Sequence, residues 1–255
     1  MKCEKEPGQP DRAILDLVGR IAGSIGPDDP NLKGWYDSYV SNHSRRIAFD
    51  VDIIRKLSAS NKKIIEFGAV PLLLSSALKA SGYPVVSIDI LPERFSSAIR
   101  RLDLEVIKCN FETEPLPFGE GTFDLVVFNE IFEHLRINLI RTMEEVRRIL
   151  KPGGILLLST PNLRSLRGIW NFVVEKVSYS CAGDLYYEYQ KLNQIGHMGH
   201  VREYTPLEVI AFTQRIGFHP LKIIYRGAYY GLTARAVTGV FPGLRPFFSL
   251  VSSKT

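Results

Sequence analysis

Residues 64–78 read IIEFGAVPLLLSSAL, and this stretch holds the transition that decides the fold. The apolar run before Gly68 has the length of a buried β-strand, and the run that follows predicts a helix with Pro71 at its first position. Nucleotide-binding α/β proteins place a glycine-rich loop at such a junction. Here Val70 and Leu72 stand where the next two glycines would be. The stretch therefore predicts a sharp turn at the ligand-binding edge of an α/β sheet.

Strands and helices continue to alternate along the rest of the chain. Apolar runs predict further parallel strands, and amphipathic segments such as 137–150 predict crossover helices between them. A last apolar run is expected to pair antiparallel and to close the edge of the sheet. The strands are expected at 62–67, 84–90, 104–109, 123–130, 155–162, 219–226 and 244–253.

The pattern divides the chain into four parts of one overall domain. Residues 1–60 hold helix-like segments and are expected to form an N-terminal helical cap, and residues 61–162 a cofactor-binding core. Residues 163–204 break the alternation, as expected of a lid or acceptor-binding insertion. Residues 205–255 then return to the C-terminal part of the core sheet.

Composition limits the classes of protein that fit. With 255 residues, 45% of them apolar, the chain can bury one core. No apolar run has the length of a membrane span, the first residues do not resemble a secretory signal, and three widely spaced cysteines favour a reducing, cytoplasmic setting. No CxxC or Cys/His spacing predicts a zinc site, and no metal is assigned.

The charge is unevenly distributed. The net charge is +5, and no Asp or Glu follows Glu208. A basic, aromatic C-terminal part suits an acidic substrate, an anionic membrane surface or nucleic acid. An ordinary last pair of strands with solvated basic side chains would look the same.

Polar residues at strand ends predict a ligand site, because open α/β sheets bind ligands beyond the carboxyl ends of their strands. Asp89 follows Gly68 by about 20 residues, the spacing at which an acid accepts hydrogen bonds from ribose hydroxyls. Asn110 and Phe111 end the third strand, where an amide and an aromatic edge can read and cover an adenine.

The loop itself discriminates between cofactors. The pyrophosphate of a dinucleotide needs close backbone approach and free N–H donors, whereas Val70 brings a Cβ atom and Pro71 lacks an N–H. S-adenosylmethionine has no phosphate, and a carboxylate such as Glu66 would favour its sulfonium cation. The sequence therefore predicts S-adenosylmethionine rather than NAD.

Five short motifs follow in order: LPF at 116–118, FDLV at 123–126, ExxEH at 130–134, LKPGG at 150–154 and TPN at 160–162. Their order and spacing resemble the core of class I S-adenosylmethionine-dependent methyltransferases. They are most similar to the group that includes ubiquinone-biosynthesis O-methyltransferases. The resemblance covers residues 61–162, with a weaker match at 199–218.

This resemblance implies an α/β, doubly wound, mostly parallel, seven-stranded Rossmann-like sheet with its last strand antiparallel. It implies S-adenosylmethionine as the cofactor, with the turn at the methionine end, an acid at the ribose and an amide near the methionine amino group. The helix around YVSNHSRR resembles the family's cofactor cap. The cofactor positions so assigned are Glu66, Gly68, Ala69, Asp89, Ile90, Asn110, Phe111, Asn129 and His43.

The ExxEH turn supplies Glu130, Glu133 and His134, which would share one face if the turn were helical. Methyl transfer needs an aligned nucleophile that loses a proton, and a histidine near neutral pKa can take that proton. Two acids and a histidine can instead hold a divalent ion, or the turn can be a structural brace. The sequence leaves these three readings open.

The segment GHMGHVREYT at 196–205 adds acceptor-site candidates. His200 is a further catalytic candidate, and His197, Arg202 and Tyr204 are assigned to the acceptor, with the arginine pairing an anionic group. The alternative is a loop that simply packs on the sheet.

The leading hypothesis is an S-adenosylmethionine-dependent methyltransferase of class EC 2.1.1 that O-methylates a small-molecule, saccharide or lipid-linked hydroxyl. A non-catalytic S-adenosylmethionine-binding protein on the same fold is the alternative. RNA methylation is a weaker one, because the core is nearly neutral and the sequence contains no NPPY-type motif or added RNA-binding module. The acceptor's identity and the oligomeric state are left open.

Overall fold

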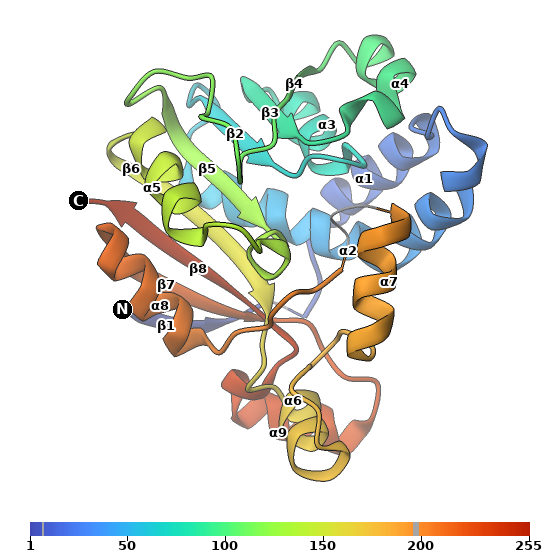
Figure 1. Ribbon diagram of the computed structural model, residues 1–255, viewed down its shortest axis with the longest axis vertical. Coiled ribbons are helices and arrows are strands. Elements are labelled where there is room, and N and C mark those ends of the chain that lie inside the picture. The colour runs from blue at the N-terminus through green and yellow to red at the C-terminus, as the bar shows by residue number, and fades with distance from the viewer. Residues whose placement is uncertain (7, 196–198) are drawn as a thin grey trace. The chain divides into compact units, whose positions relative to one another are not determined.

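The computed structural model describes residues 1–6, 8–195 and 199–255 (Figure 1). The chain divides into two compact units, each with its own set of internal contacts. The first unit comprises Met1–Glu6, Phe128–Arg148 and Pro152–Thr255, and the second comprises Pro7–Val127 and Ile149–Lys151.

The described strands form one mixed sheet in the order β1-β7-β8-β6-β5-β2-β3-β4. Strands β5, β2, β3 and β4 pair in parallel, and β8 runs antiparallel to both of its neighbours. This confirms the predicted α/β, doubly wound and mostly parallel fold with an antiparallel last strand. The strands are β1 (Lys2–Lys5), β2 (Ile64–Phe67), β3 (Val85–Asp89), β4 (Glu105–Lys108), β5 (Phe123–Asn129), β6 (Leu150–Pro161), β7 (Phe218–Arg226) and β8 (Phe247–Lys254).

Helices precede and connect these strands, as the alternating pattern predicts. Among the described residues, no helix is long and apolar enough to cross a membrane. The helices are α1 (Arg12–Ser24), α2 (Lys33–Leu57), α3 (Leu73–Ala80), α4 (Ser96–Arg101), α5 (Leu139–Ile149), α6 (Leu166–Trp170), α7 (Leu185–Ile195), α8 (Pro206–Ile216) and α9 (Leu232–Val240).

The sheet has eight strands among the described residues, not the predicted seven, because β1 pairs in parallel with β7. The backbone of Lys2–Lys5 pairs with that of Lys222–Tyr225, while all four side chains stay exposed. Beyond this strand, the buried Glu6 carboxylate accepts a hydrogen bond from Arg226 Nε at 3.0 Å and another from the Gly227 N–H. An exposed, charged strand carries no apolar alternation, so its sequence pattern does not reveal it.

The last strand, β8, was predicted to close the edge of the sheet. This was wrong, because β8 lies inside the sheet between β6 and β7. Its central side chains, including those of Phe248 and Leu250, are fully buried. A strand with neighbours on both sides satisfies all its backbone hydrogen bonds within the sheet. The apolar run of β8 is thus the sign of an interior strand.

The switch point of the parallel strands lies between β2 and β5, because β3 and β4 extend the sheet on the far side of β2. In doubly wound sheets this is where ligands bind. In the same unit, α1, α2 and α3 pack together around buried residues such as Val18, Val51 and Leu78. Tyr36 links the first two of these helices by donating a hydrogen bond to the Ala22 carbonyl at 2.8 Å.

The insertion predicted at 163–204 contains more helix than its sequence pattern suggests. Helix α6 is followed directly by a π-helical turn at Asn171–Glu175. Helix α7 was not predicted, since its tyrosine-rich apolar side chains are largely exposed and give no buried stripe. The alternation of helices and strands resumes at α8, which begins with the capping box of Thr205 and Glu208.

Candidate functional site

The turn after β2 keeps one glycine of the expected loop. Gly68 has φ +65° and donates its N–H to the Ile88 carbonyl at 2.8 Å, as does Ala69 at 3.3 Å. Leu72 also adopts the left-handed conformation, with φ +72°, and its side chain is fully buried. A residue in that conformation cannot lie within an α-helix, so α3 begins at Leu73. The expectation that Pro71 starts the helix was therefore wrong.

Asp89 fixes the shape of this turn. Its Oδ2 accepts a hydrogen bond from the Val70 N–H at 3.0 Å, and its Oδ1 accepts one from the Leu91 N–H at 2.9 Å. The carboxyl is buried, and burial raises its pKa. Each carboxylate oxygen has two lone pairs, so both can accept a second hydrogen bond from a ligand hydroxyl. Asp89 thus holds the loop and keeps acceptor capacity for the ribose that the sequence predicts here.

Glu66 is buried in a small network of hydroxyl groups. Ser75 donates a hydrogen bond to Glu66 Oε2 and accepts one from the Ser87 hydroxyl at 2.9 Å. Burial raises the pKa of Glu66 to about 8, and the charges of Asp50 and Asp89 add to this shift. Ionised Glu66 would therefore be stabilised by a cation next to it, which fits a sulfonium ligand.

Replacing Glu66 with glutamine should stabilise the ligand-free protein at alkaline pH. Burial raises the folded pKa from 4.5 to about 8, so the folded state loses stability as pH rises through this interval. Glutamine has no carboxyl proton to lose. The advantage of Glu66→Gln in urea denaturation should be small near pH ~5 and reach about 2–4 kcal/mol near pH ~8.5.

The matched control is Glu105→Gln, which changes an exposed acid on β4 and should show no such growth of the difference with pH. A free energy of unfolding for Glu66→Gln that differs from wild type by the same amount at both pH values would contradict the raised pKa.

The remaining cofactor candidates of the second unit lie on separate elements. Asn110 Oδ1 accepts a hydrogen bond from the Glu112 N–H at 3.2 Å, so its amide already shapes the turn after β4. The ring of Phe111 packs edge-on against Phe67, with centroids 5.2 Å apart. Ile90 follows β3 and is partly exposed. His43 lies on α2 with its ring 4.5 Å from that of Tyr39.

Asn129 ends β5 in the first unit, and its amide is a candidate ligand group. Both amide atoms are buried and have no hydrogen-bond partner among the described residues. A buried amide left unpaired is costly. A polar ligand that reached this amide would satisfy it, which fits the amino group expected here.

The ExxEH turn is not an α-helix. Glu130 has φ +55° and is followed by a 3₁₀ turn at Phe132–His134. The Oε1 atom of Glu130 accepts a hydrogen bond from the Ser159 hydroxyl at 2.7 Å. Glu133 Oε2 accepts one from Thr160 at 2.9 Å, while its buried Oε1 has no partner among the described residues. The turn is thus hydrogen-bonded to β6 and also leaves one carboxylate oxygen available.

His134 is a neutral imidazole with a defined tautomer. Its Nδ1 lies 2.9 Å from the Gly199 carbonyl oxygen, which can only accept, so Nδ1 carries the proton. Burial lowers the pKa of His134 to about 4, and the nearby His200 contributes to the shift. Its Nε2 therefore has a free lone pair near neutral pH.

His200 forms a pair with Glu203, and its pKa is shifted in the opposite direction to that of His134. Its Nδ1 lies 3.1 Å from Glu203 Oε1. Burial opposes the charged imidazole, but the hydrogen bond to Glu203 and the charges of Glu133, Glu203 and Glu188 outweigh burial and raise the pKa of His200. The Glu203 carboxylate is buried, yet hydrogen bonds from His200, Ser180 and Ala182 lower its pKa to about 2. An anionic carboxylate thus orients a histidine, which is the arrangement of a general base.

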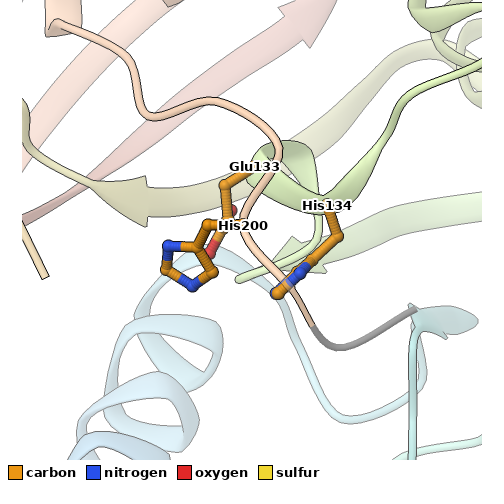
Figure 2. Close-up of side chains that lie close together, drawn as sticks. All are labelled: Glu133, His134 and His200. Carbon is orange, nitrogen blue, oxygen red and sulfur yellow. The ribbon is translucent and has the colours of Figure 1, made fainter. Parts of the chain in front are cut away.

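Glu133, His134 and His200 come together from two segments of the chain, as Figure 2 shows. Their ligand atoms lie within 4.8 Å of one another, and the two imidazole rings are 4.9 Å apart. Two imidazoles and a carboxylate suit a divalent transition-metal ion as well as proton transfer. The ligand atoms of Cys181, His200 and Glu203 also lie within 4.8 Å of one another.

The other acceptor candidates have partners within the protein. Arg202 forms an ion pair with Glu208 at 2.6 Å, and its guanidinium lies 4.9 Å from the centre of the Tyr204 ring. That ring packs edge-on against Phe132. His197 lies outside the described residues.

Two residues of this site were not singled out from the sequence. Glu203 follows His200 by three positions, a spacing that could have revealed the pair. Ser75 lies in the first turn of α3, where its hydroxyl reaches back to Glu66.

Comparisons with known proteins agree with this architecture. The sequence profile of a family described as "Methyltransferase domain" matches residues 39–222. A comparison with curated proteins finds no match.

Among solved structures, a Thermotoga maritima protein described as a SAM-dependent methyltransferase, possible histamine N-methyltransferase, aligns with a TM-score of 0.57 and 16% identity, over 88% of this chain and 97% of its own. The 1,6-didemethyltoxoflavin-N1-methyltransferase of Burkholderia thailandensis, solved with 1,6-didemethyltoxoflavin and S-adenosylhomocysteine, aligns with a TM-score of 0.57 and 13% identity, over 99% and 93%. A Methanosarcina mazei protein described as a SAM-dependent methyltransferase aligns with a TM-score of 0.53 and 20% identity, over 79% and 96%. At these identities, the likeness is one of fold.

Proposed function

Because this chain belongs to the methyltransferase-domain family and is an S-adenosylmethionine-dependent methyltransferase, we propose that it methylates a hydroxyl oxygen. The acceptor is a small molecule, a saccharide or a lipid-linked hydroxyl, as in the ubiquinone-biosynthesis O-methyltransferase group that the motifs resemble. The observation that carries this proposal is the pair of His200 and Glu203.

The second unit supplies the residues for the cofactor in this proposal. S-adenosylmethionine provides a methyl group on a cationic sulfur. Glu66 would favour that cation, and Asp89 would accept hydrogen bonds from the ribose hydroxyls while it holds the loop. Asn110 and Phe111 would border the adenine.

The first unit supplies the residues for the acceptor. A hydroxyl is a weak nucleophile until it loses its proton, so O-methylation needs a base near neutral pKa. In this proposal His200 Nε2 takes the proton, and Glu203 stabilises the imidazolium that forms. The pKa of His134 is lowered to about 4, so it stays neutral and is better suited to position the hydroxyl.

The experiment that tests this proposal has a binding arm and a transfer arm. Calorimetry with S-adenosylmethionine measures cofactor binding. Incubation with methyl-deuterated S-adenosylmethionine and matched pairs of hydroxyl and amine acceptors, read by mass spectrometry, identifies the methylated atom. Hydroxyl acceptors should carry the label, and activity should survive dialysis against a chelator.

Each of three other outcomes would contradict one part of the proposed function. Cofactor binding without transfer to any acceptor would favour the non-catalytic alternative. Label on nitrogen alone would exclude O-methylation, a relevant outcome because two structural neighbours have names that specify nitrogen. If a chelator abolished the activity and a divalent ion restored it, the general base in this proposal would have to be replaced by a metal ion bound to Glu133, His134 and His200.

A further inference from the structure

One surface of the first unit is unusually apolar. It is formed by α6, the π-helical turn and α9, and is defined by the exposed side chains of Trp170, Phe172, Val173, Leu232, Val240 and Phe241. Phe172 is 68% exposed, Leu232 82% and Val240 72%. Single exposed apolar residues are ordinary, but large contiguous patches mark interaction sites. We refer to these six residues as the apolar surface.

The two segments of the apolar surface are held together. The Arg167 N–H donates a hydrogen bond to Tyr229 Oη at 3.2 Å, and Tyr229 Oη lies 3.5 Å from the Leu244 carbonyl. Figure 1 accordingly draws α6 and α9 next to each other. The two segments that carry the exposed residues are therefore tied to each other through Tyr229.

The same two segments also carry basic side chains. Arg164, Arg167, Lys176 and Arg235 are exposed, and none of them forms an ion pair with a described residue. Glu175 is the one acidic residue within 163–177 and 228–246. Unneutralised cations around an apolar patch are complementary to a surface that is apolar inside and anionic at its boundary.

We propose that the apolar surface docks on an anionic lipid bilayer, with its aromatic and aliphatic side chains among the acyl chains and its basic residues at the phosphate headgroups. This goes beyond the proposed function, because it concerns where the enzyme sits rather than which atom it methylates. A protein partner would have to match both the apolar residues and the uncompensated cations, whereas an anionic bilayer offers both features everywhere. Docking here would give the enzyme access to a membrane-embedded acceptor.

The test is cosedimentation of the full chain with vesicles. The chain should bind vesicles of phosphatidylcholine with about 30% phosphatidylglycerol, but not phosphatidylcholine alone, and added salt should weaken binding. The double variant Phe172→Ser/Leu232→Ser should weaken it about tenfold or more through lost apolar burial. Lys176→Gln/Arg235→Gln should weaken it by about 25-fold, since each basic residue near the surface contributes about a factor of five.

Matched controls keep the test specific. Leu207→Ser and Arg215→Gln change exposed residues of α8, outside the apolar surface, and should bind vesicles like wild type. All variants should bind S-adenosylmethionine like wild type, which shows that they are folded. Failure to bind anionic vesicles, or equal losses in the α8 controls, would overturn the proposal.

A second copy of the chain is the competing occupant of the apolar surface. Sedimentation velocity distinguishes it, because the wild-type chain should remain monomeric without vesicles at micromolar concentration. A dimer that Phe172→Ser/Leu232→Ser converts to monomers would assign the surface to self-association and overturn the membrane proposal.

Discussion

Replacing His200 with glutamine should lower kcat for methyl transfer by about 10²–10⁴-fold, the usual contribution of a general base. Glutamine can keep a hydrogen bond to Glu203, but it cannot take a proton from the acceptor. The dissociation constant of S-adenosylmethionine should change by less than about threefold, because this residue is not among the cofactor candidates. Steady-state kinetics together with calorimetry separate the two effects.

The pH profile distinguishes a base from a structural residue. In wild type, kcat/KM should rise with pH as His200 loses its proton, at a pH above the ordinary histidine pKa of 6.5, because Glu203 helps to raise this pKa. Glu203→Gln removes that negative charge, so the rise should shift to lower pH. His219→Gln, at an exposed histidine, is the matched control and should leave the profile unchanged. An unshifted profile in Glu203→Gln would contradict the assigned pair.

Replacing Asp89 with asparagine should weaken S-adenosylmethionine binding by about 100-fold or more. The carboxylate accepts backbone N–H groups of Val70 and Leu91, and an asparagine of the same shape must turn an NH₂ group toward one of them. An unsatisfied buried N–H costs about 1–3 kcal/mol, and the ribose loses an anionic acceptor as well. The unsatisfied N–H weakens the turn in the free and the bound protein alike, whereas the lost acceptor, in the proposed ribose role, weakens the bound state alone.

Calorimetry with S-adenosylmethionine measures this loss, and urea denaturation measures how much of it reflects a weakened fold. Asp103→Asn is the matched control, since that carboxylate is exposed and pairs with Lys79 on the surface. An Asp89→Asn protein that is less stable but binds the cofactor with wild-type affinity would reduce Asp89 to a structural brace.

The parallel part of the fold is readable from the sequence because its signal is local. A buried strand such as β2 must be a short apolar run, and residues at its end, such as Glu66 and Gly68, then fall at the binding edge. The exposed side chains of Lys2–Lys5 give no such signal, since β1 is fixed by backbone pairing with β7. The interior place of β8 is likewise set by partners that are distant in sequence.

The candidate site was predictable to the extent that strand ends position it. Asp89 could be found by its spacing from Gly68, whereas the same turn contains a left-handed Leu72, a conformation that no propensity predicts for leucine. Arg202 has the right chemistry for an anionic acceptor, yet Glu208 lies close enough to pair with it. The role of Glu203 depends on its burial, which a single sequence does not reveal.

The turn that replaces the glycine-rich loop has a consequence for how binding energy is used. A glycine loop is free to sample many conformations before a ligand arrives. Here the buried Leu72 side chain and the Asp89 carboxylate hold the turn when the protein folds. Its conformational entropy is therefore lost during folding rather than at the moment of binding, which leaves more of the contact energy available for affinity. Such a loop should recognise one ligand shape well and adapt poorly to others.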